Sequence, residues 1–409
     1  MVSLRGPTAS AGEMKYVVMG GAGAMGRIAV RDLFEFAEPD DELVIADFDG
    51  EKAARLAAGY KDSRVRAEPV DVRNHEQTVH VLRGALVVLN CLQHNLNLSV
   101  MEAASAARCH YIDLGGLFHF TLKQLELDDR FCKAGRLAIV GMGAAPGITN
   151  VLARMGADQL EQVREIHCRV AGVDKTRYEN PPALPISYSL QTILEEFSLE
   201  PALYSKGELT FVPPMSGQIP MQFPPPVGTQ RPMYTIHSEL ATLPKSFAGN
   251  GVQEVSFKIA FDPEFLQKVK FLRDLGLAGG EPIPVGAIKV SPIEVLNKVV
   301  LSQKPGRPIG RLKQYEIVRT VLKGIRGGKK VTLILDCHTA GYSKWAIGSD
   351  INTGSPPAAV ARMIGQGEIQ GSGVFAPEQI VPPIAFFAHL RKRGLFLKTK
   401  CRSDWSLKT

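Results

Sequence analysis

Residues 15–26 read KYVVMGGAGAMG, a short apolar segment that runs directly into a glycine-rich turn. The apolar segment has the length of a buried strand, and from Ala24 to Phe36 apolar side chains recur at helical spacing. A GxGxxG turn between a strand and a helix is typical of folds that bind a dinucleotide. Its glycines allow a tight turn, close approach of a pyrophosphate and close packing of helix on strand. A tight turn without a ligand is the alternative. We expect cofactor contacts at Gly21, Gly23, Ala24, Met25 and Gly26.

The alternation of short apolar segments with helical ones continues through the first third of the chain. Strands are predicted at 15–19, 43–46, 64–70, 85–90, 110–114 and 137–140, and helices at 24–36, 50–58, 74–83, 95–107 and 121–134. Short strands that are apolar throughout are typical of a parallel sheet covered by helices on both faces. The sequence therefore predicts an α/β fold with a Rossmann-type, doubly wound parallel sheet.

Polar side chains stand where these predicted strands end. Asp47 ends the second strand, where a carboxylate accepts hydrogen bonds from the adenosine ribose of a dinucleotide. Its charge would repel a 2′-phosphate, and Phe48 and Asp49 follow it without an arginine, so NAD is predicted and NADP is less favoured. A solvated acid at a strand end is the alternative. Because ligands bind at the carboxyl ends of parallel strands, further cofactor contacts are predicted at Asp71, Val72, Asn90, Cys91 and Leu92.

Length and composition limit the class of protein. A chain of 409 residues is too long for one compact core and predicts two domains. Its 45% apolar and 22% charged residues are typical of a folded protein, and no apolar run approaches the length of a membrane span. Residues 1–13 hold no continuous apolar stretch, so we expect a disordered extension and no signal peptide. Six cysteines without a CxxC pair predict no metal site and a reducing, cytoplasmic location.

The net charge of +7 is spread along the chain except near the C-terminus. There Arg391, Lys392 and Arg393 are followed by Lys398 and Lys400. A nucleic-acid surface needs a concentrated basic stripe, whereas a solvated terminal helix explains this cluster more simply. We therefore expect no nucleic-acid partner.

Several motifs in the second half of the first domain and beyond carry a resemblance to a known family. They are YIDLGG at 111–116, APGITN at 145–150, YS at 188–189, EFS at 196–198, PPVG at 225–228, TLPKSF at 242–247 and GVFAPEQIVP at 373–382. In this order and spacing they resemble the saccharopine dehydrogenase family, most closely its bacterial lysine 6-dehydrogenase-like members. The resemblance covers about residues 15–394.

The resemblance implies an NAD(P)-dependent oxidoreductase of lysine 6-dehydrogenase or saccharopine dehydrogenase type. Such an enzyme transfers a hydride between nicotinamide and the C–N carbon of a lysine-derived amino acid, so a small amino acid or amine is the expected partner. It also implies an inserted α+β substrate and dimerisation domain with a mixed sheet, and hence a homodimer. A non-catalytic NAD-binding redox sensor or scaffold is the alternative. The expected division is an extension (1–13), a dinucleotide-binding domain (14–143), a substrate domain (144–353), returning C-terminal helices (354–394) and a tail (395–409).

The middle of the chain and its C-terminal end have fewer signals. Alternating apolar residues predict strands at 163–173 and 251–261. Residues 316–340 could form a helix and a strand; a hairpin is preferred, whose turn lies within 324–328 and whose return strand covers 330–338. Residues 213–232 hold seven prolines and predict a long loop that serves as a functional cover or an interface. Ser355-Pro356-Pro357 predicts the start of a helix that ends at Gly365. A last helix is predicted at 383–393, before Gly394.

Amine oxidation requires a base that takes the proton of the ammonium group, because only the neutral amine can expel a hydride. His119, His237 with Glu239 two residues later, and Tyr188 are the candidate bases. Asp113 is a candidate for binding a substrate ammonium or orienting a base. For each histidine, a surface or core position is the alternative.

The nicotinamide must lie close to the carbon that loses the hydride. We expect the nicotinamide to lie beside the strand end at Asp113 and Gly115 and beside the turn at Pro146. A simple domain hinge is the alternative explanation of the segment 145–147. A substrate carboxylate needs a cation, for which Lys175, Arg177 and Arg231 stay open.

Overall fold

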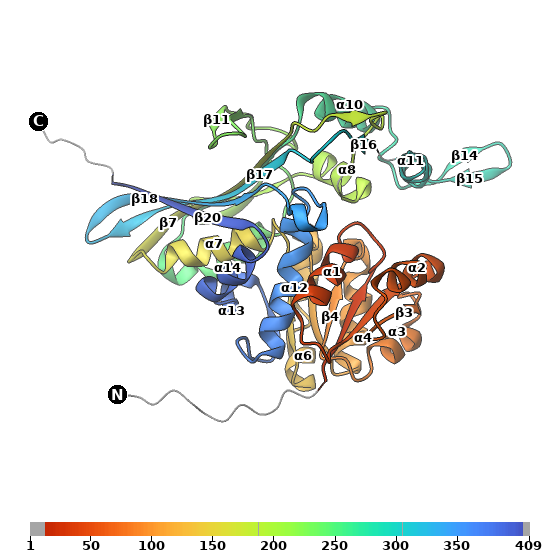
Figure 1. Cartoon of the computed structure of the whole chain (residues 1–409). Coiled ribbons are helices and arrows are strands. Elements are labelled where there is room, and N and C mark those ends of the chain that lie inside the picture. Colours follow the sequence, from red (N-terminus) through yellow and green to blue (C-terminus); the bar gives the residue numbers. More distant parts are fainter. Residues whose placement is uncertain (1–12, 187, 305, 404–409) are drawn as a thin grey trace, which may run out of the picture.

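The computed structural model describes residues 13–403 apart from residues 187 and 305, so nearly all of the expected N-terminal extension lies outside the described residues. Within them, seven parallel strands form the first sheet in the order β19-β6-β5-β4-β1-β2-β3 (Figure 1). Their bounds are β1 Lys15–Met19, β2 Glu42–Asp47, β3 Val65–Pro69, β4 Val87–Asn90, β5 His110–Asp113, β6 Leu137–Ile139 and β19 Gly373–Phe375. The six predicted strands and the doubly wound parallel sheet are confirmed.

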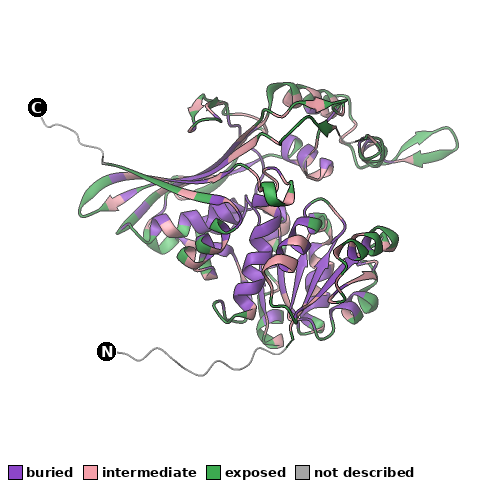
Figure 2. Ribbon diagram, in the orientation of Figure 1, coloured by how far each residue is buried: buried purple, intermediate pink, exposed green. Residues whose placement is uncertain are grey.

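Helices cover both faces of this sheet, so its central strands are buried, whereas the edge strand β3 is mostly half-buried (Figure 2). They are α1 Gly26–Phe36, α2 Gly50–Tyr60, α3 His75–Leu82, α4 Asn97–Ala106 with a preceding turn η1 His94–Leu96, α5 Leu117–Leu125 and α6 Asp128–Ala134. The single helix expected at 121–134 is wrong, because the segment forms two helices. The second begins at Asp128, whose carboxylate accepts the amide of Val374 at the start of β19 (2.7 Å). That long-range contact is invisible in the local pattern.

The second sheet is mixed, in the order β10-β9-β13-β7-β17-β18-β20. Only β13 and β7 pair in parallel among its described strands. Their bounds are β7 Gln162–Asp174, β9 Ala202–Ser205, β10 Glu208–Phe211, β13 Glu254–Ala260, β17 Gln314–Arg326, β18 Lys329–Thr339 and β20 Leu395–Ser403. The predicted hairpin is β17–β18, and its two-residue turn Gly327-Gly328 has positive φ at both positions, as a type I′ turn requires.

Shorter elements complete the second domain. The helices are α7 Ile148–Ala157, α8 Leu190–Ser198, α9 Glu239–Ser246, α10 Pro263–Asp274 and α11 Pro292–Leu301, and the short strands are β8 Tyr178–Glu179, β11 Met221–Gln222, β12 Thr229–Gln230, β14 Ile283–Val285, β15 Ile288–Val290 and β16 Arg307–Pro308. The proline-rich loop carries the small β11–β12 hairpin. Phe223 and Val227 of this loop pack on Ala171 and Ile317, whereas α7 and α9 pack on the opposite face of the sheet. The loop is thus a cover for that sheet, and no functional role of it is tested.

The helix expected to start at Ser355 begins four residues earlier, as α12 Ile351–Gly365, with both prolines inside it. Each proline removes one intrahelical N–H, which normally breaks a helix. Here the segment is buried and packs along α1 (Figure 1), so closely that a Cβ on Gly354 would lie 2.5 Å from Cβ of Ile28. Tertiary packing therefore outweighs the local propensity. The predicted end at Gly365 is confirmed.

The expected tail is also corrected, because residues 395–403 form the edge strand β20 along β18. Residues 404–409 lie outside the described residues. The last helix, α14 Pro383–Arg391, ends two residues before the prediction and packs on α12, α7 and β20. Nor is the basic cluster wholly solvated: Arg393 is fully buried and forms a two-pronged ion pair with Asp32 of α1. In the described part of the chain, no helix is long and apolar enough to cross a membrane.

Candidate active site

The glycine turn forms a cradle at the carboxyl end of β1. A Cβ on Gly26 would lie 2.1 Å from the carbonyl oxygen of Gly20, so only glycine allows α1 to approach β1 this closely. Gly23 is less crowded: an added Cβ would meet only the Gly20 oxygen, at 3.0 Å. The backbone amides of Ala24 and Met25 donate to no group among the described residues. Free amides at a helix N-terminus are the donors that a pyrophosphate needs, so the turn fits a dinucleotide.

Asp47 lies at the end of β2 beside this turn. Its carboxylate accepts the amides of Ala22 (3.0 Å) and Asp49 (3.1 Å). Asp47 therefore stabilises the turn and lies where the adenosine ribose of a dinucleotide binds in this fold. Phe48 is largely exposed, and the guanidinium of Arg73 stacks over its ring at 5.6 Å.

The other strand-end residues divide into surface and core positions. Asp71 at the end of β3 is engaged by Arg73, whose hydrogen bonds hold the pKa of that carboxyl below its usual range. Val72 packs into the core. The buried amide of Asn90 donates to Asn97 (2.9 Å) and to the Tyr111 hydroxyl (3.0 Å). Cys91 and Leu92 continue this strand end, and the Leu92 side chain lies against the glycine turn at Gly20.

Asp113 is buried at the end of β5 and its carboxylate is fully engaged inside the domain. It accepts the Tyr111 hydroxyl (2.8 Å), the amides of Gly115 (2.9 Å) and Gly141 (2.6 Å), and the amide of Gln124. Burial raises its pKa, against these hydrogen bonds. Asp113 thus fixes the strand end, and within the described structure no imidazole contacts it; its predicted role toward substrate stays untested.

The junction of the two domains lies next to that strand end. The ring of Pro146 would clash with a Cβ on Gly115, which has a φ of +121°. The amide of Gly116 donates to Ser238 Oγ (3.3 Å), and so does the hydroxyl of Thr121 (3.0 Å). The residue before Ser238 is therefore brought to the carboxyl edge of the parallel sheet.

That residue is His237, and it forms a dyad with Glu239. Nδ1 of His237 bonds the buried Glu239 carboxylate, whose other oxygen accepts the Thr149 hydroxyl (2.7 Å). The imidazole stacks on Phe257 of β13, with ring centroids 3.7 Å apart and planes 10° from parallel. Burial alone would lower the pKa of His237, but the Glu239 carboxylate raises it above the ordinary value. Nε2 bonds no described group and is the atom left to exchange a proton.

Tyr188 is connected to His237 through Glu196, a residue that was not among the predicted catalytic residues. Its hydroxyl donates to Oε2 of Glu196 on α8 (3.0 Å), and Glu196 is close enough to His237 for their charges to interact. Burial raises the pKa of Glu196 to about 7 and that of Tyr188 well above its usual value. The adjacent Glu195 bonds Nε2 of the buried His94 (2.9 Å), which links α8 to η1 of the first domain. Glu196 is the first residue of the EFS motif at 196–198, so the motif was the sequence signal that could have indicated this residue.

His119 lies apart from this cluster. It is exposed on α5 and stacks against Phe211 of β10 (centroids 6.4 Å apart). The three open cations, Lys175, Arg177 and Arg231, have no described contact with His237 or Glu196. Of the predicted catalytic residues, the structure brings together His237, Glu239 and Tyr188. In the described chain, no group of His, Cys, Asp and Glu side chains could hold a metal ion.

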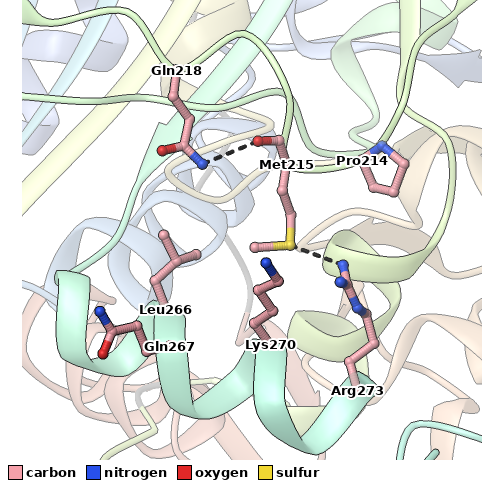
Figure 3. Close-up of a pocket in the computed structure, with 7 residues that line it drawn as sticks. All are labelled: Pro214, Met215, Gln218, Leu266, Gln267, Lys270 and Arg273. Carbon is pink, nitrogen blue, oxygen red and sulfur yellow. Dashed lines mark hydrogen bonds between the residues drawn. The ribbon is translucent and has the colours of Figure 1, made fainter. Parts of the chain in front are cut away.

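A cavity of about 410 Å³ lies elsewhere in the second domain (Figure 3). Lys270 and Arg273 of α10 face Met215 and Gln218 across it, and Arg273 also donates to the carbonyl of Phe197 (2.7 Å). None of the residues of the glycine turn or of the His237 cluster lines this cavity. It is therefore not part of the candidate active site.

Comparison with family models covers most of the chain. The saccharopine dehydrogenase NADP binding domain matches residues 17–139, and the saccharopine dehydrogenase C-terminal domain matches residues 143–395. The chain belongs to the saccharopine dehydrogenase family. It is accordingly an NAD(P)-dependent oxidoreductase that acts on CH–NH donors, and the expected resemblance, fold class and enzyme class are confirmed.

The similarity to two curated relatives and to one solved structure extends over most of the chain. Carboxyaminopropylagmatine dehydrogenase from Synechocystis sp. is 23% identical over 93% of this chain and 96% of its own length. Carboxynorspermidine synthase from Vibrio cholerae is 23% identical over 88% of this chain and 91% of its own. Apo saccharopine dehydrogenase (L-Glu forming) from Saccharomyces cerevisiae has a TM-score of 0.71 at 15% identity, over 95% of this chain and 100% of that one, and shows the shared fold alone.

Proposed function

We propose that this enzyme breaks or forms the C–N bond of a secondary amine that joins a carboxylated alkyl chain to a polyamine, with His237 as the base. The observation that carries the proposal is the dyad of His237 and Glu239. Nε2 of His237 bonds no described group, and the next residue, Ser238, accepts the amide of Gly116 just after β5, where the two domains meet.

The dyad is suited to deprotonate a substrate ammonium. Glu239 accepts the proton on Nδ1 and is itself fixed by Thr149, so the neutral imidazole has its lone pair on Nε2. Such an arrangement sets the tautomer and the orientation of a general base, and general-base catalysis contributes roughly 10²–10⁴-fold to a rate. The glycine turn and Asp47 would hold a nicotinamide dinucleotide, which would accept the hydride.

The charge around the dyad favours a substrate with several cationic nitrogens. Acidic groups continue beyond Glu196: Glu316 of β17 lies close enough to Tyr188 for their charges to interact, and Asp350, before α12, lies close enough to Glu316. Burial raises the pKa of Glu316 to about 7 and that of Asp350 to about 6. Both carboxyls are half-buried; Asn352 donates to Glu316 and Arg27 lies near Asp350, and a further cation nearby would stabilise their charged forms. The names of the two curated relatives contain a polyamine or agmatine that bears a carboxylated group.

For the cofactor we propose NAD over NADP, supported by the carboxylate of Asp47 at the ribose position. The homodimer expected from the resemblance stays a prediction; light scattering on the purified protein checks it. Lysine-derived amino acids are the competing substrate class, without a structural feature that favours them over polyamines.

The experiment incubates purified protein with NAD or NADP and each of four amines: carboxynorspermidine, carboxyaminopropylagmatine, saccharopine and lysine. The absorbance of reduced cofactor is followed. The proposal expects the highest kcat/KM with one of the first two amines, and a fall of roughly 10²–10⁴-fold in His237→Gln without loss of cofactor affinity. Preference for saccharopine or lysine would contradict the substrate class, and full activity in His237→Gln would contradict the base.

A further inference from the structure

Glu196 is a buried acid whose position the dyad alone does not explain. Its side chain is 3% exposed and close enough to His237 for their charges to interact. Tyr188 occupies Oε2, and no group among the described residues donates to Oε1. No lysine or arginine of the described chain pairs with it. Oε1 is therefore available to a molecule bound beside His237.

The groups that face Glu196 come from three elements. Tyr188 lies before α8, Glu195 is its neighbour on α8, and His237 and Glu239 come from the segment that enters α9. Burial raises the pKa of Glu196 to about 7, further raised by Glu239 and Glu195 and opposed by His237 and Tyr188. A carboxyl group that titrates near neutral pH can both accept and donate a proton there.

We propose that Glu196 is a second proton-transfer residue, which exchanges a proton with water at the imine carbon while His237 exchanges one with the amine nitrogen. This inference rests on the proposed function. Two separate groups are needed because the reaction moves protons at two atoms, the nitrogen and the incoming oxygen. While His237 still holds the proton that it took from the amine, it cannot also take one from water.

The steps balance as follows in the oxidative direction. His237 takes the proton of the secondary ammonium, and loss of hydride from the adjacent carbon leaves an iminium. Water forms a C–O bond at that carbon and gives one proton to the Glu196 carboxylate. His237 then returns its proton to the nitrogen, the C–N bond breaks, and the hydroxyl becomes a carbonyl as its proton passes to solvent. In the reverse direction protonated Glu196 supplies the proton that lets water leave the carbinolamine.

The test separates hydride transfer from C–N cleavage in one turnover. Wild-type enzyme, NAD and the amine that it turns over are mixed rapidly; reduced cofactor is read by absorbance and the released primary amine by chemical quench. In Glu196→Gln we expect formation of reduced cofactor at a rate within about twofold of wild type, and amine release slowed roughly 10²-fold or more. The ionisation near pH 7 in the release rate should vanish. Glu195→Gln is the matched control: it changes the next residue in the same way and should not separate the two rates.

Each possible result of this experiment either supports or overturns the role of Glu196. Should Glu196→Gln lose cofactor binding, Tyr188→Phe carries the same test, because removing the hydrogen bond that lowers the pKa of Glu196 shifts the ionisation to higher pH. Equal slowing of both rates, or unchanged release with the ionisation retained, overturns the inference while leaving the proposed function intact. Absence of reduced cofactor with every amine in wild type would instead reject the proposed function.

Discussion

Glu239→Gln tests the dyad without emptying a buried site. The amide keeps the size of the carboxylate and can still bond Thr149, but it can donate to Nδ1 of His237. The imidazole would then carry its proton on Nε2, the wrong nitrogen for a base. Loss of the correct tautomer removes general-base catalysis, so kcat should fall roughly 10²–10⁴-fold while the Kd for the cofactor stays unchanged.

The same variant should change the pH dependence of stability. The Glu239 carboxylate raises the pKa of His237 in the folded protein, so the pair contributes stability that is complete below the unfolded pKa of about 6.5. That stability is lost as pH rises from there through the raised folded pKa. Glu239→Gln removes the charge that raises the pKa, so the difference in Tm between wild type and variant should shrink over this window.

The assay pairs steady-state rates of amine oxidation with thermal unfolding across the same pH range. Glu378→Gln is the matched control, because Glu378 is a buried carboxylate bonded to Asn150 and Ser246, with no contact to His237. It should change stability but not the pH midpoint of activity. If Glu239→Gln retained more than about a third of wild-type kcat, an effect far below the range for a lost base, the reasoning about the dyad would be refuted.

Three further predictions concern the cofactor domain. Asp47→Ser should weaken NAD about 10- to 100-fold by calorimetry and leave NADP affinity equal or improved; unchanged NAD affinity would contradict the ribose assignment. Gly26→Ala places a Cβ against the Gly20 oxygen and should cost about 1–3 kcal/mol of unfolding free energy together with NAD binding, whereas Gly59→Ala, where nothing lies within 4 Å, should cost neither. Arg393→Met leaves Asp32 buried without its partner and should cost about 3–5 kcal/mol in denaturant unfolding; a loss below 1 kcal/mol would show that the pair is not buried in solution.

Six of the seven strands of the first sheet were predictable, because each of these six carries a local signal. The central residues of β1, β2 and β4 form continuous apolar runs, and the side chain of Asn74 caps α3 by accepting the amide of Gln77, as the sequence indicates. β19 was not predicted, since its three residues have no pattern of their own and join the sheet only through β6 and Asp128. The start of α12 predicted from Pro356 and Pro357 was wrong because a long-range contact again outweighs the local pattern. The helix is stabilised by burial against α1.

The site was predictable in part. His237, Glu239 and Tyr188 were chosen as residue types fit for proton transfer, and the fold brings them together. His119 is a residue of the same type that lies on the surface of α5, and no local pattern distinguishes it from His237. Glu196 was missed as a functional residue because part of its environment, His237 and Glu239, comes from a segment about 40 residues away. β20 was missed although Leu397, Thr399 and Cys401 alternate with basic residues along that strand.

The most direct test of the central claim follows the hydrogen itself. Carboxynorspermidine carrying deuterium on the carbons bonded to its secondary nitrogen is oxidised with unlabelled NAD, and the reduced cofactor is analysed by mass spectrometry. The account predicts one deuterium on the nicotinamide ring per turnover, and loss of this transfer in His237→Gln. Reduced cofactor without deuterium would show that the hydride does not come from a C–N carbon and would contradict the account.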